Sequence, residues 1–366
     1  MTRARDLGIP LDGEPGPRNA ITDVAGVEIG HTTLIHGDGP LRVGAGPVRT
    51  GVTVVLPRGR RYAPCFAGTH VLNGNGEMTG TAWIRESGFL EGPVAITNTH
   101  SVGVVRDAIV AWQHQHALVD PLAPGIYWIM PVVAETYDGF LNDINGMHVR
   151  AEHVHAALDG ALAGAFAEGA VGGGTGMSCH GFKGGIGSAS RVADVGNGQR
   201  YTVGVLVQAN HGSREEFVVA GVPVGRLLSE IPDPFAADSA PPPGTGSIIV
   251  IVATDAPLLP HQLDRIARRV PIGLARTGAT GSTYSGDLFL AFSTANAGAA
   301  DRRELRALAM LPNDLMNPLF VATVQAVEEA VLNALVAATT MIGADGRTVE
   351  AIPHERIAEL MRARPW

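Results

Sequence analysis

The chain has 366 residues, of which 45% are hydrophobic and 17% are charged, and its formal net charge at pH 7 is -8. This composition is typical of a globular protein with a large core, and it excludes a disordered chain. Because nucleic acids and anionic membranes attract clustered Lys and Arg, the acidic balance predicts neither as a partner.

The N-terminal 20 residues contain basic side chains without an apolar run behind them, so they do not resemble a secretory signal. No stretch of the chain approaches the roughly 18 to 20 apolar residues of a membrane span. Cys65 and Cys179 stand apart, without the partner spacing of a zinc site or of a disulfide framework. We therefore expect a cytoplasmic protein.

Strands and helices are predicted in alternation along the chain. Segments rich in β-branched and aromatic residues, several of them apolar on both faces, predict buried strands at 51–57, 126–136, 201–210, 247–254 and 287–294. Three- and four-residue apolar spacing predicts helices over 148–166 and 319–340, the second with Asn317 as its N-cap and Pro318 at its first position, and Asp255 with Pro257 precedes a further helix. The simplest layering has sheets inside and helices outside.

Two familiar nucleotide and hydrolase motifs are absent. The glycine cluster at 172–187 resembles a phosphate loop, but it lacks the Gly-Lys-Ser/Thr ending that holds phosphate and magnesium. The chain also has no Gly-x-Ser-x-Gly elbow, which excludes an ordinary α/β-hydrolase nucleophile.

A Pro-rich segment, 231–246, is the strongest discontinuity in the chain, and the most apolar strand begins directly after it at Ser247. If the Gly246–Ser247 peptide bond were cut, Ser247 would carry both a hydroxyl nucleophile and an α-amino base whose unperturbed pKa is about 7.7 to 8.0. Gly246 would leave the hydroxyl unobstructed, since it has no side chain. The alternative from these residues alone is an ordinary loop serine at a strand start.

Seven segments, in this order, resemble the DmpA-type L-aminopeptidase/D-esterase family, to which the β-peptidyl aminopeptidases belong. They are RNAITDVAGVEIGHTT (18–33), GNGEMTG (74–80), PVVAETYDGFLNDING (131–146), GGGTGMSCHGFKGGIGSASR (172–191), VLVQANHG (205–212), GTGSIIVIVATDAPLLPHQL (244–263) and SGDLFLAFSTAN (285–296). The resemblance implies a single α/β domain over 1–366, a four-layer αββα sandwich of the N-terminal-nucleophile type. It also implies self-cleavage into an α chain (1–246) and a β chain (247–366) that stay associated, with tetramers of the αβ unit.

Transferred to this sequence, the resemblance makes Ser247 the nucleophile and Gly246–Ser247 the cleaved bond. Asn210 matches an asparagine of the oxyanion hole, and its position just past a buried strand suits a fixed amide donor. Ser285 matches a serine beside the nucleophile, and Asp287 matches a carboxylate that is Glu in some relatives and that orients Ser285 or the amine. Since residues i and i+2 of a strand share a face, Ser285 and Asp287 can point at one site.

Glu135 and Tyr137 have the same i, i+2 spacing, and we expect them to share a face as well. The resemblance implies that Glu135 binds the free amine of the substrate and that Tyr137 lies close to the nucleophile. From the residues alone, Glu135-Thr136-Tyr137 is interpreted as a polar strand end.

The predicted function is a serine aminopeptidase or amidase that releases N-terminal residues from small peptides, amides or esters with a free amine through an acyl-enzyme on Ser247. The resemblance implies no metal and no organic cofactor. Two alternatives stay open: a related oligoamide hydrolase or ornithine acetyltransferase, for which we expect threonine at the cleavage point, and an unprocessed, inactive binding or scaffold protein.

Overall fold

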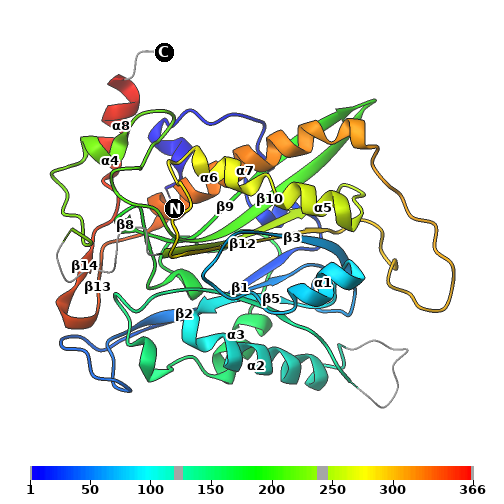
Figure 1. Cartoon of the computed structure of the whole chain (residues 1–366), viewed down its shortest axis with the longest axis horizontal. Coiled ribbons are helices and arrows are strands. Elements are labelled where there is room, and N and C mark those ends of the chain that lie inside the picture. Colours follow the sequence, from blue (N-terminus) through cyan, green and yellow to red (C-terminus); the bar gives the residue numbers. More distant parts are fainter. Residues whose placement is uncertain (1, 119–126, 237–245, 364–366) are drawn as a thin grey trace.

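The computed structural model describes residues 2–118, 127–236 and 246–363, and these residues form four layers (Figure 1). Two sheets lie face to face in the middle. Helices α2 (Val102–Gln115) and α3 (Ala151–Asp159) cover the outer face of one sheet, and α5 (Pro260–Ala267), α6 (Val270–Ala275) and α7 (Asn317–Ala337) cover the other. The αββα sandwich predicted from the sequence is confirmed.

Within the described residues one sheet has four strands and the other has six. The four-stranded sheet has the order β1 (Glu28–His36), β2 (Val48–Leu56), β5 (Val94–Asn98), β6 (Val132–Thr136). The six-stranded sheet has the order β4 (Phe89–Leu90), β3 (Cys65–Gly74), β12 (Ser285–Ser293), β11 (Gly246–Thr254), β10 (Gln199–Asn210), β9 (Gly185–Gly196). The β11–β12 and β5–β6 pairs are parallel, and the other neighbours are antiparallel.

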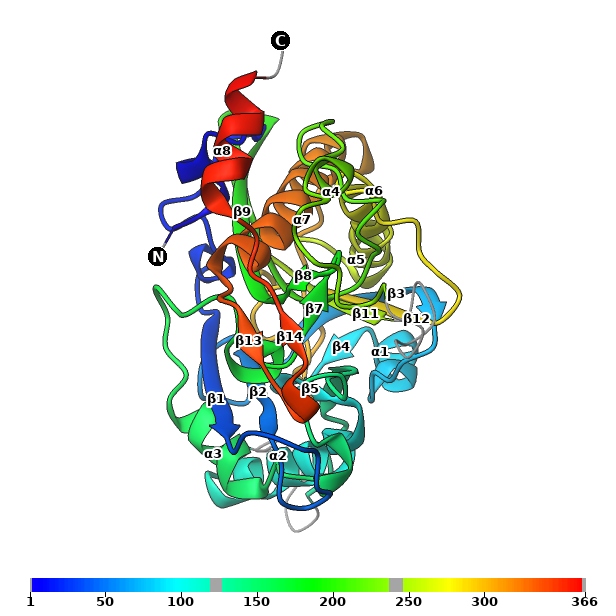
Figure 2. The ribbon, with the colours of Figure 1, turned by 90° about the vertical axis from the view of Figure 1, so that its left-hand side faces the viewer.

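Two short hairpins and three further helices complete the α-helices and β-strands of the described residues. The hairpins are β7 (Ser178–Cys179) with β8 (Phe182–Lys183), and β13 (Met341–Ile342) with β14 (Thr348–Val349). The helices are α1 (Thr81–Ser87), α4 (Val224–Leu227) and α8 (His354–Ala363). Figure 2 shows α8 at one end of the molecule, beside the N-terminal segment.

Strand β11 is buried on both faces, as its apolar run predicts. Ile248, Val250 and Val252 point into the core between this sheet and its helices. The intervening side chains, from Ile249 to Ala253, point into the core between the two sheets. This two-residue alternation fixes which layer each side chain of the strand enters.

The ends of several predicted elements differ from the structure. The strand predicted over 126–136 starts at Val132, and residue 126 lies outside the described residues. The helix predicted over 148–166 covers only Ala151–Asp159, since Gly160 follows it. Asn317 is the first residue of α7 instead of its N-cap, and Pro318 is still accommodated because the first turn needs no N–H from it. Of the predicted linker 231–246, residues 237–245 lie outside the described residues.

The stretch Asn313–Ala337, which includes α7, is long and apolar enough to cross a membrane by length and composition alone. The expectation that the chain contains no such stretch is therefore wrong for this segment. In the fold, 83% of its most apolar window is buried, and α7 packs against β9 and β10. Its all-round apolar character is thus explained by its position in the core.

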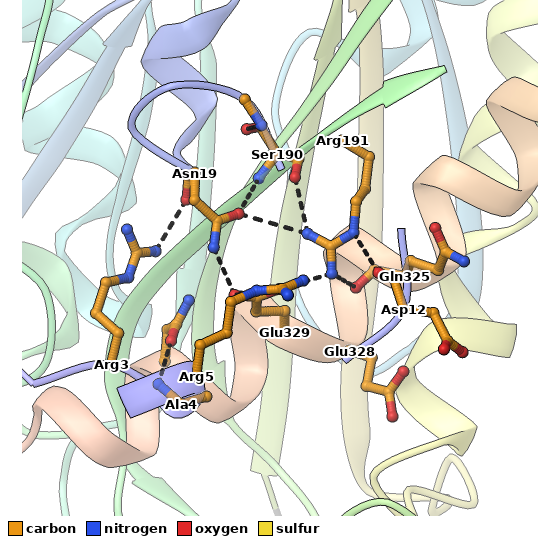
Figure 3. Close-up of polar contacts among 12 residues, drawn as sticks. Arg3, Ala4, Arg5, Asp12, Asn19, Ser190, Arg191, Gln325, Glu328 and Glu329 are labelled. Atoms are coloured by element: carbon orange, nitrogen blue, oxygen red, sulfur yellow. Dashed lines mark hydrogen bonds and ion pairs between the residues drawn. The ribbon is translucent and has the colours of Figure 1, made fainter. Parts of the chain in front are cut away.

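A buried ion-pair network ties the N-terminal segment and β9 to α7 (Figure 3). The Glu329 carboxylate accepts from Arg191 at 2.6 Å and from Arg5 at 2.9 Å, and the side chains of Glu329 and Arg191 are 0% and 1% exposed. Burial alone would raise the pKa of Glu329, but its bonds to the two guanidinium groups outweigh burial and lower that pKa.

Replacing Glu329 by alanine is expected to destabilise the fold by about 3–5 kcal/mol, because it leaves the Arg191 guanidinium buried without its counter-ion. Chemical denaturation followed by circular dichroism measures this change. The matched control is Asp107→Ala, which breaks an exposed pair with Arg106 and should cost less than about 1 kcal/mol. Equal losses in the two variants would contradict a stabilising role for the network.

Candidate active site

Ser247 lies at the start of β11, in the middle of the six-stranded sheet, and is only 4% exposed. Across the antiparallel pair its partner is Asn210 on β10, and across the parallel pair its partner is Gly286 on β12. The two neighbouring strands therefore place side chains and backbone groups on both flanks of the serine.

The Ser247 hydroxyl is held by backbone groups. Its Oγ accepts from the Gly286 N–H at 3.1 Å and donates to the Gly246 carbonyl oxygen at 2.7 Å. The hydroxyl is thus next to the carbonyl of its own preceding peptide bond. A Cβ at position 246 would lie 2.4 Å from the Asn210 carbonyl oxygen, so this close strand approach requires glycine.

Asn210 shares the inter-sheet face of the six-stranded sheet with Ser247, because paired residues of adjacent strands point the same way. Its Oδ1 accepts from the Ser178 N–H at 2.8 Å, which fixes the orientation of the amide, and its Nδ2 donates to the Tyr137 carbonyl at 2.9 Å. A preorganised amide donor beside the serine is the arrangement that a developing oxyanion needs.

Ser285 and Asp287 point together, as their spacing predicts: Ser285 Oγ donates to Asp287 Oδ1 at 2.6 Å. Since Ser285 pairs with Gly246 and not with Ser247, both side chains lie on the face opposite the Ser247 side chain, toward the helices. They border a cavity of about 170 Å³ there. The pair therefore lies on the face of β11 opposite the Ser247 hydroxyl, and Asp287 interacts with the backbone of Ile248.

The carboxylate of Asp287 also accepts from Asn73 Nδ2 at 2.9 Å, so a third strand, β3, holds it. Burial raises the pKa of Asp287, and the hydrogen bonds from Ser285 and Asn73 partly oppose that rise. The shorter aspartate arm reaches Ser285 without difficulty.

Glu135 lies at the end of β6 in the opposite sheet and is 3% exposed. Its Oε1 accepts from the Glu77 N–H at 2.9 Å, and Thr99 Oγ1 donates to its Oε2. Burial raises the pKa of Glu135, while these hydrogen bonds oppose the rise. Each carboxylate oxygen retains a lone pair with which to accept from a cation.

Gly76 lies between the Glu135 carboxylate and Gly286, the residue whose N–H binds the Ser247 hydroxyl. A Cβ at position 76 would lie 3.1 Å from Glu135 Oε1 and 3.1 Å from the Cα of Gly286, whose N–H binds the Ser247 hydroxyl. The carboxylate is therefore at most twice that distance from Gly286, which puts it within reach of a small molecule whose carbonyl lies at Ser247.

That Glu135 and Tyr137 share one face stays a prediction. β6 ends at Thr136, so the i, i+2 rule of strands does not extend to Tyr137, whose side chain is 43% exposed. Its hydroxyl lies against Gly139, and its carbonyl accepts from Asn210. Burial raises the pKa of Tyr137.

Several groups that hold the site were not predicted, namely the backbone N–H groups of Glu77, Ser178 and Gly286 and the side chains of Asn73 and Thr99. Backbone donors leave no residue-type signal in a sequence. Asn73 and Thr99 are ordinary polar residues until the sheet pairing brings them to the carboxylates.

Comparison with known proteins gives consistent matches over the whole chain. The sequence pattern described as "Peptidase family S58" matches residues 19–349. Beta-peptidyl aminopeptidase BapA of Sphingosinicella microcystinivorans is 53% identical over 98% of this chain and 92% of its own length. Two solved structures are similar in fold and sequence: a Burkholderia beta-aminopeptidase (TM-score 0.88, 51% identity, 100% of this chain and 99% of the other) and an L-aminopeptidase D-Ala-esterase/amidase of Ochrobactrum anthropi (TM-score 0.91, 47% identity, 99% and 98%), described as a variant of the Ntn hydrolase fold.

Proposed function

This chain belongs to peptidase family S58 and is an aminopeptidase or amidase of that family, and from this premise we propose that it is made as a precursor, cuts its own Gly246–Ser247 bond and then uses Ser247 as an N-terminal nucleophile. One observation carries the proposal: the buried Ser247 hydroxyl donates to the carbonyl oxygen of the bond that would be cut. The intact mass of the purified protein tests it, since cleavage gives chains of 246 and 120 residues.

Self-cleavage needs only groups of this chain and water. Attack of the Ser247 hydroxyl on the Gly246 carbonyl carbon forms an ester, and as the C–N bond breaks the hydroxyl proton passes to the liberated amine of Ser247. Water then hydrolyses the ester to the Gly246 carboxylate and the free Ser247 hydroxyl. The same hydroxyl, with the new α-amine as its base, attacks the substrate carbonyl to give an acyl-enzyme and a free amine product.

The other site residues take roles that follow from their contacts. Asn210 stabilises the oxyanion, because it is the cross-strand partner of Ser247. The Ser285–Asp287 pair orients the new amine, because Ser285 pairs with Gly246 across β11 and β12. Glu135 binds the ammonium of the substrate and so sets the distance from the chain end to the carbonyl that reacts. Tyr137 contributes its backbone carbonyl, which accepts from Asn210 and so helps to orient that amide.

The strand order supports continued association of the two chains after cleavage. Strands β11 and β12 of the β chain lie between β3 and β10 of the α chain, so backbone hydrogen bonds cross from one chain to the other on both sides. The Glu329 network adds ion pairs between them. We further propose the tetramer of αβ units that the family resemblance implies.

Substrates with an N-terminal β-amino acid residue are the first class that we propose. Two of the similar proteins, both more than 50% identical, are named for β-peptides or β-amino acid residues. Glu135 would bind the substrate amine while Ser247 attacks the substrate carbonyl. The fixed distance between these two side chains would then distinguish a β-amino acid residue, which has one more backbone carbon, from an α-amino acid residue.

With the substrate bound, kcat is expected to rise with pH and then to stay level into mildly alkaline solution. The Ser247 amine acts as a base only when neutral, and its unperturbed pKa is about 7.7 to 8.0. Ionisation of Glu135 and Asp287, whose pKa values burial raises, acts in the same direction as pH rises. A kcat that is constant from about pH 5 to 9 would contradict amine-assisted attack.

A further inference from the structure

A thiol and two imidazoles, those of Cys179, His180 and His211, form a cluster in the interior beside the site described above. The sulfur and one nitrogen of each imidazole lie within 4.8 Å of one another, and all three residues are buried. The sequence hides this cluster, because the first two residues lie in the β7–β8 hairpin and the third follows β10. The hairpin packs on that strand end through the His180 N–H, which donates to the His211 carbonyl at 2.8 Å.

Two imidazole nitrogens in the cluster are buried without a hydrogen bond. Among the residues that the structure describes, neither the Nε2 of His180 nor that of His211 has a partner. His180 uses Nδ1 toward the Ser213 carbonyl at 3.1 Å, which makes Nδ1 the donor and leaves a bare lone pair on Nε2. Buried polar atoms of this kind normally have partners, so the Nε2 of His180 calls for an unseen one, while His211 presents its Nδ1 to Cys179.

From this geometry we propose that Cys179, His180 and His211 bind one Zn²⁺ ion. A thiolate and imidazoles are the ligands that zinc prefers, in tetrahedral geometry. Metal-bound histidines commonly donate their other ring N–H to a backbone carbonyl, as His180 does to Ser213. Binding breaks the Cys179 S–H bond and releases its proton to water, while the sulfur forms the metal bond.

The required movement is small. In a tetrahedral zinc site the ligand atoms are roughly 3.5 Å apart, given metal–ligand bonds of about 2.0 to 2.3 Å. Cys179 Sγ and His211 Nδ1 are already 3.7 Å apart. The remaining separations, at most 4.8 Å, must shorten by up to about 1.3 Å through movement of the three side chains.

The cluster adjoins a cavity through His211. His211 borders the cavity of about 170 Å³, together with Gly212, Glu216 and the Ser285–Asp287 pair. An ion can enter from this cavity and keep a water there as its fourth ligand, which is the pattern of zinc sites with three protein ligands. A bound ion would also tether His211, the residue next to Asn210.

The positive and negative charges around the proposed metal site nearly cancel. Arg214 donates to the carbonyls of the hairpin and Lys183 is buried beside Cys179, and both oppose a cation. Glu216, which borders the same cavity, and the thiolate formed on binding favour one.

Cobalt titration of untagged, metal-free protein tests the site, because Co²⁺ reports tetrahedral thiolate ligation by its absorption. We expect one equivalent per chain, a cobalt–thiolate band in the near ultraviolet, and loss of the band when one equivalent of Zn²⁺ is added. Cys179→Ser should abolish that band, and Cys65→Ser, which removes the other cysteine of the chain, should leave it unchanged.

A second variant keeps the test decisive if Cys179→Ser does not fold. His180 has a left-handed backbone (φ 49°), which asparagine tolerates well, so His180→Asn removes the ligand without straining the turn. It should weaken cobalt binding at least about tenfold, the minimum effect of changes around metal ligands. Absence of stoichiometric binding to the wild-type protein, or a thiolate band that persists in Cys179→Ser, would show two packed histidines and no metal site.

Discussion

Replacement of Ser247 by alanine is expected to leave one chain of 366 residues and to lower turnover by at least about 10⁴-fold, because it removes the hydroxyl that cuts the precursor and attacks the substrate. Wild-type protein should separate on a denaturing gel into chains of 246 and 120 residues, and the intact mass of each should place the cut between Gly246 and Ser247. Binding energy and the oxyanion donor would account for the residual rate.

Two matched variants isolate the role of the hydroxyl. Ser293→Ala removes an equally buried serine at the far end of β12, whose hydroxyl donates to the Ala256 carbonyl, and it should be processed normally. Ser247→Cys retains a nucleophile with an α-amine and should recover processing. Wild-type protein that is fully active while uncut would overturn the proposed mechanism.

Acetylation of the substrate amine is expected to lower kcat/KM at least tenfold, since the acetylated substrate lacks the ammonium that Glu135 binds and leaves this buried carboxylate unpaired. A β-alanyl anilide and its N-acetyl derivative form a suitable pair. With Glu135→Gln the penalty for acetylation should shrink, because the neutral amide has no charge to pair with the ammonium.

Glu77→Gln is the matched control for Glu135→Gln. It removes one negative charge close to the site and retains the Glu77 backbone N–H that donates to Glu135. Since the like charge of Glu77 raises the pKa of Glu135, its removal favours the ionised carboxylate. The ratio between the free and acetylated substrates should therefore stay near the wild-type value in this variant. Equal kcat/KM values for the two substrates in the wild-type enzyme would remove Glu135 from substrate binding and reopen an endo-acting amide hydrolase.

Local sequence patterns determined the layers of the fold and part of the site. The apolar run from Ile248 to Thr254 requires burial on both faces, and two-residue periodicity places Ser285 and Asp287 together without any knowledge of the tertiary structure. The position of Ser247 after a Pro-rich segment needed no structure either. Each of these inferences depends on neighbours within a few residues, where chain geometry is fixed by covalent structure.

Only the tertiary structure decided what depends on pairing between distant segments. The register of β11 with β12 puts Ser285 opposite Gly246, and so on the other face from the Ser247 hydroxyl. β6 ends at Thr136, so strand periodicity does not place Tyr137, and packing of a hairpin against β10 joins Cys179 to His211. Strand register and packing are set by contacts between segments far apart in the chain, and no local period of the sequence contains them.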